Sequence, residues 1–256
     1  ATFTGMGVIL AAIAVLGILV IKPYPEDRGL SPDGIPLTEE ERARMMAETQ
    51  SDSSFSIREM FSYKETWFII IANFFVYFMQ TALMSQLIPR FLDTGIPMSQ
   101  ALFVMSTAAV IGIPISYLWG ILDDKLTTPI ASGIFALTYI LGMVFVLLAS
   151  PERPVFIYLT IAFVAGATAG HPNLTANIVS YVFGRKNYIA ASRFTTLAND
   201  FGRTVSFTFM AAVFSRSQSY DNAYKIMIGT AIVAALFYFL IRKSYDPDRG
   251  AKGGAS

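Results

Sequence analysis

Seven hydrophobic segments, each about as long as a lipid bilayer is thick, are the dominant feature of the chain. They cover residues 3–21, 67–88, 101–122, 129–149, 155–182, 194–214 and 224–241. An apolar helix of about 20 residues crosses the hydrocarbon core of a membrane. Charged residues make up 14% of the chain, whereas a soluble domain carries about 25%. The sequence therefore predicts an all-α fold, a polytopic membrane helix bundle.

Lysine and arginine gather in alternate loops. One set of loops, which includes the C-terminal tail, carries Lys22, Arg28, Arg42, Arg44, Arg58, Lys64, Lys125, Arg185, Lys186, Arg242, Lys243, Arg249 and Lys252, with Arg193 at a segment end. The other set carries Arg90, Arg153 and Arg216, with Lys225 at a segment end. Loops rich in these residues stay in the cytoplasm. We therefore expect a multi-pass protein of the cell (inner) membrane, with the long first loop and the C-terminus in the cytoplasm.

The loop between the first two segments, residues 23–66, differs from the others in length and composition. Its first half is rich in proline, which favours an extended linker. Thr38 and Glu41 then have the spacing of a capping box that begins a helix. A short amphipathic helix leading to Trp67 at the membrane interface follows, with the apolar residues Phe55, Ile57, Met60 and Phe61. The loop is interpreted as a linker between two bundles, or alternatively as a regulatory or partner-binding loop.

The amino-acid sequence of this loop resembles that of a known family. The run P-E-D-R-G-L-S-P-D-G at 25–34, the run S-F-S-I-R-E-M-F at 54–61 and the following Trp67 are similar to the central loop of major facilitator superfamily transporters. The closest resemblance is to bacterial members related to the monocarboxylate and oxalate/formate carriers.

In that family such a loop joins two six-helix bundles. The resemblance implies that residues 1–22 are the last helix of an N-terminal bundle, that 23–66 are the central loop, that 67–243 are the C-terminal six-helix bundle and that 244–256 are a cytoplasmic tail. The chain would then hold family helices six to twelve, and its partner, the N-terminal transmembrane bundle, would be missing.

A second motif supports the resemblance. Gly120, Asp124 and Lys125 are similar to the start of the family's loop motif G-x-x-x-D-[RK]-x-G-[RK]-[RK]. The second half departs from the pattern, because residues 127–129 are Thr-Thr-Pro. The resemblance implies a structural role for this loop, in which Asp124 caps a helix of the other bundle.

Polar residues inside the hydrophobic segments give the candidate substrate site, because ionisable groups in a membrane are costly and mark functional positions. The resemblance implies that the second, third, fifth and sixth segments line the solute cavity. The substrate-binding candidates there are Arg203, His171, Gln80, Tyr77, Asn73 and Asn173. Asn73, Tyr77 and Gln80 share one helical face, and such residues also serve as hydrogen-bond glue between helices. Gly166 and Gly170, in G-x-x-x-G spacing, predict close helix packing.

Three ionisable residues in these segments, Arg203, Asp200 and His171, have side chains suited to a specific chemical role. Arg203 provides the fork of donors that binds a carboxylate bidentately. Asp200, three residues earlier, either takes part in coupling or neutralises Arg203 in a structural lock between helices. His171, the single histidine of the chain, either carries a coupling proton or packs as a neutral residue.

These observations predict a secondary active transporter that moves a small solute by alternating access. An organic anion such as a mono- or dicarboxylate is the expected solute, with a proton or a counter-anion as the coupled species. The monocarboxylate carriers place an Asp/Arg pair in family helix eight, which the segment 101–122 lacks; Arg203 would replace it.

A seven-helix receptor or sensor is the alternative. The single histidine and the absence of cysteine leave no catalytic cluster in the membrane, so neither an enzyme nor a cofactor or metal site is expected. The net charge of +1 offers no field to attract nucleic acid.

Overall fold

The computed structural model describes residues 2–20, 38–41, 43 and 57–242. The proline-rich part of the predicted central loop, 23–37, and the predicted tail, 244–256, lie outside the described residues. The chain divides into two compact units, Ala1–Ser54 and Phe55–Ser256.

The first unit contains the helix α1, Thr2–Val20, which carries no charged residue in its sequence. Further along, the predicted capping box is confirmed. The backbone N–H of Thr38 donates to Glu41 Oε2 (3.0 Å), the Thr38 hydroxyl donates to the same oxygen (2.7 Å), and the backbone N–H of Glu41 donates to Thr38 Oγ1 (3.3 Å). These reciprocal bonds satisfy backbone donors that the first turn of a helix leaves free.

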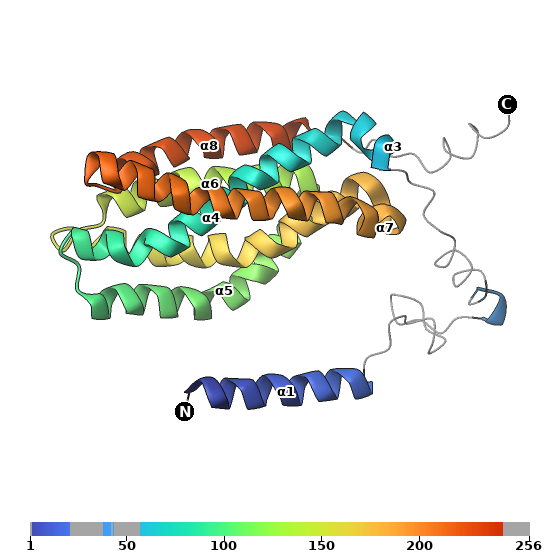
Figure 1. The fold of residues 1–256 in the computed structure, drawn as a ribbon, viewed down its shortest axis with the longest axis horizontal. Helices are drawn as coiled ribbons and strands as arrows, with labels where there is room; N and C mark the ends of the chain where they lie inside the picture. The colour runs from blue at the N-terminus through green and yellow to red at the C-terminus, as the bar shows by residue number, and fades with distance from the viewer. Residues whose placement is uncertain (1, 21–37, 42, 44–56, 243–256) are drawn as a thin grey trace. The chain divides into compact units, whose positions relative to one another are not determined.

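The second unit is a bundle of helices, and the described residues contain no β-strand, so the all-α prediction is confirmed. The elements are α3 (Ile57–Ser62), α4 (Lys64–Asp93), α5 (Met98–Leu126), α6 (Thr128–Leu148), α7 (Pro154–Ser217) and α8 (Asp221–Leu240). Pro97 precedes α5 and Pro154 begins α7, at helix starts where the missing N–H of proline is tolerated. Helices α4 to α8 lie alongside one another (Figure 1).

Helix α7 folds back on itself at one residue. Two separate helices were expected, at 155–182 and 194–214, and the structure joins them through Gly184, whose φ is 72° and ψ is 170°. Glycine adopts a positive φ without a steric penalty, so a single residue reverses the chain. We call Pro154–Gly184 the first arm of α7 and residues 185–217 the second arm.

Five segments have the length and composition of a membrane span: α4, α5, α6, the first arm of α7 and α8. The two other predicted spans are helical but fall outside this set. The apolar part of α1 is the shorter stretch Gly7–Leu19, and the second arm of α7 contains Asn199, Asp200 and Arg203 near its middle. A helix that packs beside membrane-length helices while carrying such residues must turn them toward protein or water.

The core lies where α4 meets the other helices. Helix α4 packs against both α7 and α8, α6 packs against α8 and α7, and α5 packs against α7. Helix α5 buries one narrow stripe, which includes Ala101, Val104, Ala108 and Gly112, at the helical spacing of three to four residues. The opposite side of α5 is open, and Tyr117 there is 75% exposed.

The predicted amphipathic helix before Trp67 is present as α3 and packs on the bundle. Met60 is buried, and the ring of Phe61 lies 5.5 Å from that of Trp67 and 5.3 Å from that of Phe194 in the second arm of α7. The Trp67 indole N–H donates to the carbonyl of Phe61 (3.2 Å). Residues 57–62 therefore pack with the bundle, although the sequence places them in the loop 23–66.

The two glycines of the G-x-x-x-G motif have different surroundings. A methyl group on Gly170 would lie 2.8 Å from the Trp119 ring and 2.9 Å from the Phe135 ring, so this position requires glycine. A methyl group on Gly166 would meet no atom within 4 Å. The carbonyl of Gly166 instead accepts a hydrogen bond from the Trp119 indole (3.0 Å). The predicted close packing is thus found at Gly170 and not at Gly166.

Candidate substrate site

The side chain of Tyr77, on α4, contacts both arms of α7. Its ring centroid lies 4.2 Å from that of His171 in the first arm, and the two rings meet edge to face. The guanidinium carbon of Arg203, in the second arm, lies 4.6 Å from the centroid of the Tyr77 ring. A cation at this distance is attracted by the electrons of the ring face. The fold therefore brings together three predicted site residues that are far apart in the sequence.

Arg203 lies on an open face of the bundle. Its Nη1 is 3.7 Å from Oδ1 of Asp200, and the two side chains are 51% and 60% exposed. An ion pair at this distance and exposure contributes little to stability. The predicted pairing within one helix is present, and it leaves the guanidinium accessible.

His171 is buried, with 7% of its surface exposed, between aromatic rings. Besides Tyr77, the ring of Phe135 lies 6.4 Å away. Its Nε2 is buried and has no hydrogen-bond partner among the described residues. Buried polar atoms are almost always paired, so this nitrogen marks a position that a proton, a water molecule or a ligand can complete.

A chain of polar contacts continues from Tyr77 into the interior. The Tyr77 hydroxyl lies 3.4 Å from Oγ1 of Thr175, whose hydroxyl donates to the carbonyl of His171 (2.7 Å). Asn73 donates its amide N–H to the carbonyl of Thr175 (3.4 Å) and accepts from the hydroxyl of Tyr238 on α8 (2.6 Å). Asn73 is fully buried, and its contacts tie α4 to α7 and α8.

Gln80 and Asn173 lie apart from this cluster. Gln80 accepts a hydrogen bond from the hydroxyl of Tyr139 on α6. Asn173 donates to Oγ of Ser116 on α5 (3.1 Å). Both atoms of this second contact belong to residues that line a hollow of about 400 Å³ between α4, α5 and α7.

The loop-motif residues lie at the Leu126 end of α5. Asp124 and Lys125 are exposed, and a methyl group on Gly120 would meet no atom within 4 Å. Gly120 and Asp124 line a second hollow of about 330 Å³, which also touches Ser116 and Asn173. Next to Asp124, the side chain of Asp123 accepts a hydrogen bond from Asn177 in the first arm of α7 (2.8 Å).

The comparison with protein families decides the class. Residues 1–207 match the family model described as Major Facilitator Superfamily. The chain belongs to the major facilitator superfamily. No curated protein matches the chain.

Major facilitator proteins are membrane transporters, so this chain is a multi-pass membrane protein of a transporter family. No observation favours the alternative of a seven-helix receptor. Within the described part of the chain, no three histidine or acidic residues come close enough to hold a metal ion.

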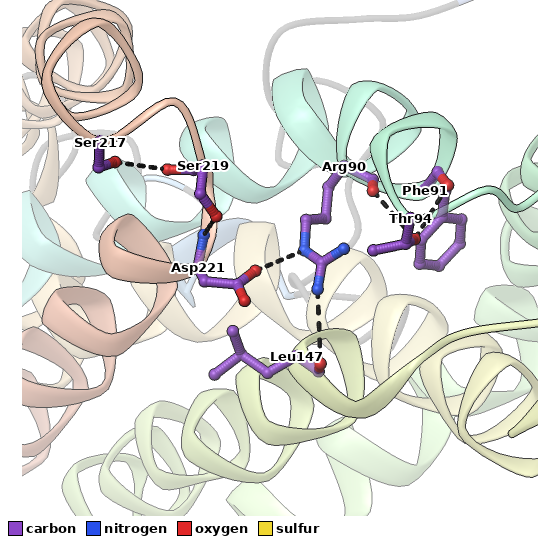
Figure 2. Close-up of polar contacts among 7 residues, drawn as sticks. All are labelled: Arg90, Phe91, Thr94, Leu147, Ser217, Ser219 and Asp221. Carbon is purple, nitrogen blue, oxygen red and sulfur yellow. Dashed lines mark hydrogen bonds and ion pairs between the residues drawn. The ribbon is translucent and has the colours of Figure 1, made fainter. Parts of the chain in front are cut away.

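One polar cluster of this major facilitator chain, around Arg90, is not predictable from the sequence (Figure 2). Arg90, at the C-terminal end of α4, has 4% of its side chain exposed, and its Nε lies 3.0 Å from Oδ1 of Asp221. The contact is an ion pair without hydrogen-bond geometry at Nε. A second guanidinium nitrogen of Arg90, Nη2, donates to the carbonyl of Leu147 at the end of α6 (3.4 Å).

The same cluster is braced by serine and threonine. Thr94 donates to the carbonyls of Arg90 (3.2 Å) and Phe91 (3.0 Å). The hydroxyl of Ser219 accepts from the backbone N–H of Asp221 (3.2 Å) and so fixes the start of α8. The sequence alone places Arg90 in a loop, and no local spacing indicates its partner Asp221, which lies at the start of α8.

Proposed function

We propose that this chain is the C-terminal half of a secondary transporter that carries an organic anion, and that Arg203 binds the carboxylate of the solute. The observation that carries the proposal is the placement of Arg203 over Tyr77. The ring holds the guanidinium by one face, while Asp200 engages it only at 3.7 Å. Its remaining donors are available for the bidentate contact that arginine makes with carboxylates.

The rest of the cluster supports the same proposal. His171 also contacts the Tyr77 ring, and its buried Nε2 has no hydrogen-bond partner among the described residues. A proton taken up there would be linked to the anion site through Tyr77, which contacts both residues. If the transporter instead exchanges the solute for a counter-anion, His171 would stay neutral and Arg203 would bind the two anions in turn.

Alternating access needs two halves that move about a shared site. We therefore also propose that an N-terminal bundle completes the transporter, that the protein lies in the cell (inner) membrane, and that the Lys64 end of α4 faces the cytoplasm. The excess of Lys and Arg in the loops at that end supports this orientation.

The proposal is tested by anion binding to the intact transporter with Arg203→Lys. Lysine keeps the charge but loses the fork, and the loss of a hydrogen bond to a charged group costs about 1.5–3 kcal/mol. We expect roughly a ten- to hundredfold loss of affinity with an unchanged melting temperature. Arg216→Lys, at an exposed position near the end of the same arm, is the matched control and should leave affinity unchanged.

A second variant separates binding from a structural lock. Asp200→Asn should leave anion affinity unchanged or raise it, because it frees the guanidinium. If Arg203 and Asp200 serve only to lock helices, both variants should lower the melting temperature and neither should change affinity. Unchanged affinity in a well-folded Arg203→Lys protein would refute the anion site.

The two coupling modes are separated with His171→Gln. A proton-coupled carrier should lose uptake driven by a pH gradient and keep exchange of labelled for unlabelled anion. A counter-anion exchanger should keep exchange and show no gradient-driven uptake in either form.

A further inference from the structure

The hollow of about 400 Å³ between α4, α5 and α7 has the character of a ligand pocket. Ligand pockets measure about 300–1,000 Å³ and are mostly apolar, with a few placed polar groups. The apolar lining here includes Met84, Met105, Ala109, Ile113, Val164 and Ala169. The polar lining consists of Ser116, Thr168 and Asn173.

The hollow adjoins the Tyr77 cluster along two helices. On α7, its lining residues Thr168 and Pro172 lie on either side of His171 in the sequence, within one helical turn. On α4, its lining residue Met84 follows Tyr77 by two turns, which is about 10 Å at 1.5 Å per residue. If the carboxylate of a solute is bound at Tyr77 and Arg203, the rest of the solute can therefore extend into this hollow.

The hydrogen-bonding state of the lining restricts what fits. The Thr168 hydroxyl is used by the carbonyl of Val164 (2.7 Å). One amide N–H of Asn173 donates to Oγ of Ser116 (3.1 Å). What Ser116 and Asn173 still offer is the hydroxyl proton of Ser116 and the carbonyl oxygen and second amide N–H of Asn173. No charged side chain is among the described residues that line the hollow, so a second carboxylate buried there would have no opposite charge to offset the loss of its hydration.

The surroundings favour a solute over a lipid tail as the occupant. The Ser116–Asn173 pair is shared with the second hollow, which continues along α5 to the carboxylate of Asp124. One turn beyond Asn173, the pair Asp123–Asn177 lies on the same side of α5 and α7. Polar and ionisable groups in membrane helices face the protein interior or a water-filled cavity. The side of α5 and α7 that carries these polar pairs is therefore expected to face water and not lipid.

We propose that this hollow binds the uncharged body of the solute, so that the transported anion is a monocarboxylate with an apolar chain and not a short dicarboxylate. The proposal rests on the anion site proposed at Arg203. One hydroxyl or amide group on the chain is compatible with the free positions of Ser116 and Asn173.

The test measures binding of straight-chain monocarboxylates, from acetate to octanoate, to the intact transporter. Dicarboxylates of the same lengths and the corresponding primary amides form two parallel series. Each buried methylene should raise monocarboxylate affinity by about fourfold until the hollow is full. Dicarboxylates should bind more weakly than monocarboxylates of equal length.

Ala109→Leu fills part of the hollow from an exposed position on α5. It should make affinity level off at a shorter chain and weaken octanoate by more than about tenfold, while acetate is unaffected. Ala162→Leu, an exposed alanine of α7 that is not among the lining residues, is the matched control and should leave the whole series unchanged.

The outcomes separate this proposal from the one on which it rests. Amides that bind as tightly as the acids, with the chain-length dependence intact, would overturn the anion site and uphold the hollow. Affinity independent of chain length, tighter dicarboxylates, or an equal effect of Ala109→Leu on every member would overturn the hollow. A lower melting temperature of Ala109→Leu without any change in binding would show that lipid or another helix occupies it. Absence of binding in all three series would overturn both.

Discussion

The guanidinium Nε of Arg90 lies 3.0 Å from Oδ1 of Asp221, and this contact joins the end of α4 to the start of α8. The same side chain also binds the last turn of α6 through the carbonyl of Leu147. A cation suits the C-terminal ends of α4 and α6, and an anion suits the N-terminal end of α8, because these charges oppose the helix dipoles. The side chain of Arg90 therefore joins three helix ends, α4 to α8 by the ion pair and α4 to α6 by the hydrogen bond (Figure 2).

We expect Asp221→Asn to lower the stability of the bundle, because Arg90 is nearly buried and would lose its carboxylate. Removing one partner of a buried ion pair costs about 3–5 kcal/mol. Asp221 is 42% exposed, so solvent screening reduces the cost to about 1–2 kcal/mol. Thermal unfolding in detergent measures the change.

The exchange Arg90→Asp with Asp221→Arg should recover part of the loss of either single change, since the two charges would meet again. Arg153→Ala, at an exposed arginine in the loop between α6 and α7, is the control and should leave the melting temperature unchanged. Additive losses in the double variant would show that the pair has no coupling energy.

The two glycines of the G-x-x-x-G motif should respond differently to the same substitution. Gly170→Ala places a methyl group 2.8 Å from the ring of Trp119, which packs edge to face on Phe135 and cannot withdraw easily. Overpacking of a core costs about 1–3 kcal/mol. Gly166→Ala meets open space, so its stability should change by no more than about 0.5 kcal/mol. Equal melting temperatures of the two variants would contradict the close approach at Gly170.

The helices were predictable from the sequence, whereas their partners were not. Apolar length located α4, α5, α6 and α8 within a few residues, because crossing a membrane requires a continuous helix. The face of Asn73, Tyr77 and Gln80 was also predictable from helical spacing. Where those three side chains point is set by which helices converge on α4: Asn73 contacts Tyr238 of α8, Gln80 contacts Tyr139 of α6, and Tyr77 contacts α7.

The partners Tyr139 and Tyr238 lie in strongly apolar helices, where nothing in the local sequence distinguishes a tyrosine that donates to a buried amide from one that only packs. The reversal of the chain at Gly184 could not be predicted from the sequence either. A glycine between two helical segments is common, and the positive φ that removes the expected loop depends on the packing of both arms of α7 against α4. The hydrogen-bond partners of these tyrosines and the turn at Gly184 thus depend on three-dimensional packing, which the periodicity of the sequence does not determine.

The capping box of the long loop gives a prediction about pH. The pKa of Glu41 lies below its ordinary value of 4.5, because the backbone N–H and the hydroxyl of Thr38 both bind its carboxylate. A lowered pKa means that the cap is fully formed above the ordinary value and is lost as the pH falls through the pKa of the folded state. NMR titration of Glu41 should show a raised pKa, closer to 4.5, in Thr38→Ala, whereas Thr38→Ser should keep it low. An identical pKa in Thr38→Ala and the parent would contradict the cap.

Asp124, the acidic residue of the loop motif, is exposed at the Leu126 end of α5. The resemblance of its motif to that of major facilitator loops implies that it caps a helix of the other bundle in one of the two conformations. A carboxylate at a helix N-terminus is worth about 0.3–1 kcal/mol, which corresponds to roughly a two- to fivefold change in a conformational equilibrium. Asp124→Asn should therefore change the transport rate by a factor of this size and leave solute affinity nearly unchanged.

Asp123→Asn is the matched comparison, because Asp123 is the neighbouring acid but accepts a hydrogen bond from Asn177 within the bundle. Its loss should lower the melting temperature, with a smaller effect on the conformational balance. Transport rates and equilibrium binding measured side by side on the two variants separate these roles. A large loss of solute affinity in Asp124→Asn, at an unchanged conformational balance, would show that Asp124 contacts the solute in the second hollow and that its role is not structural.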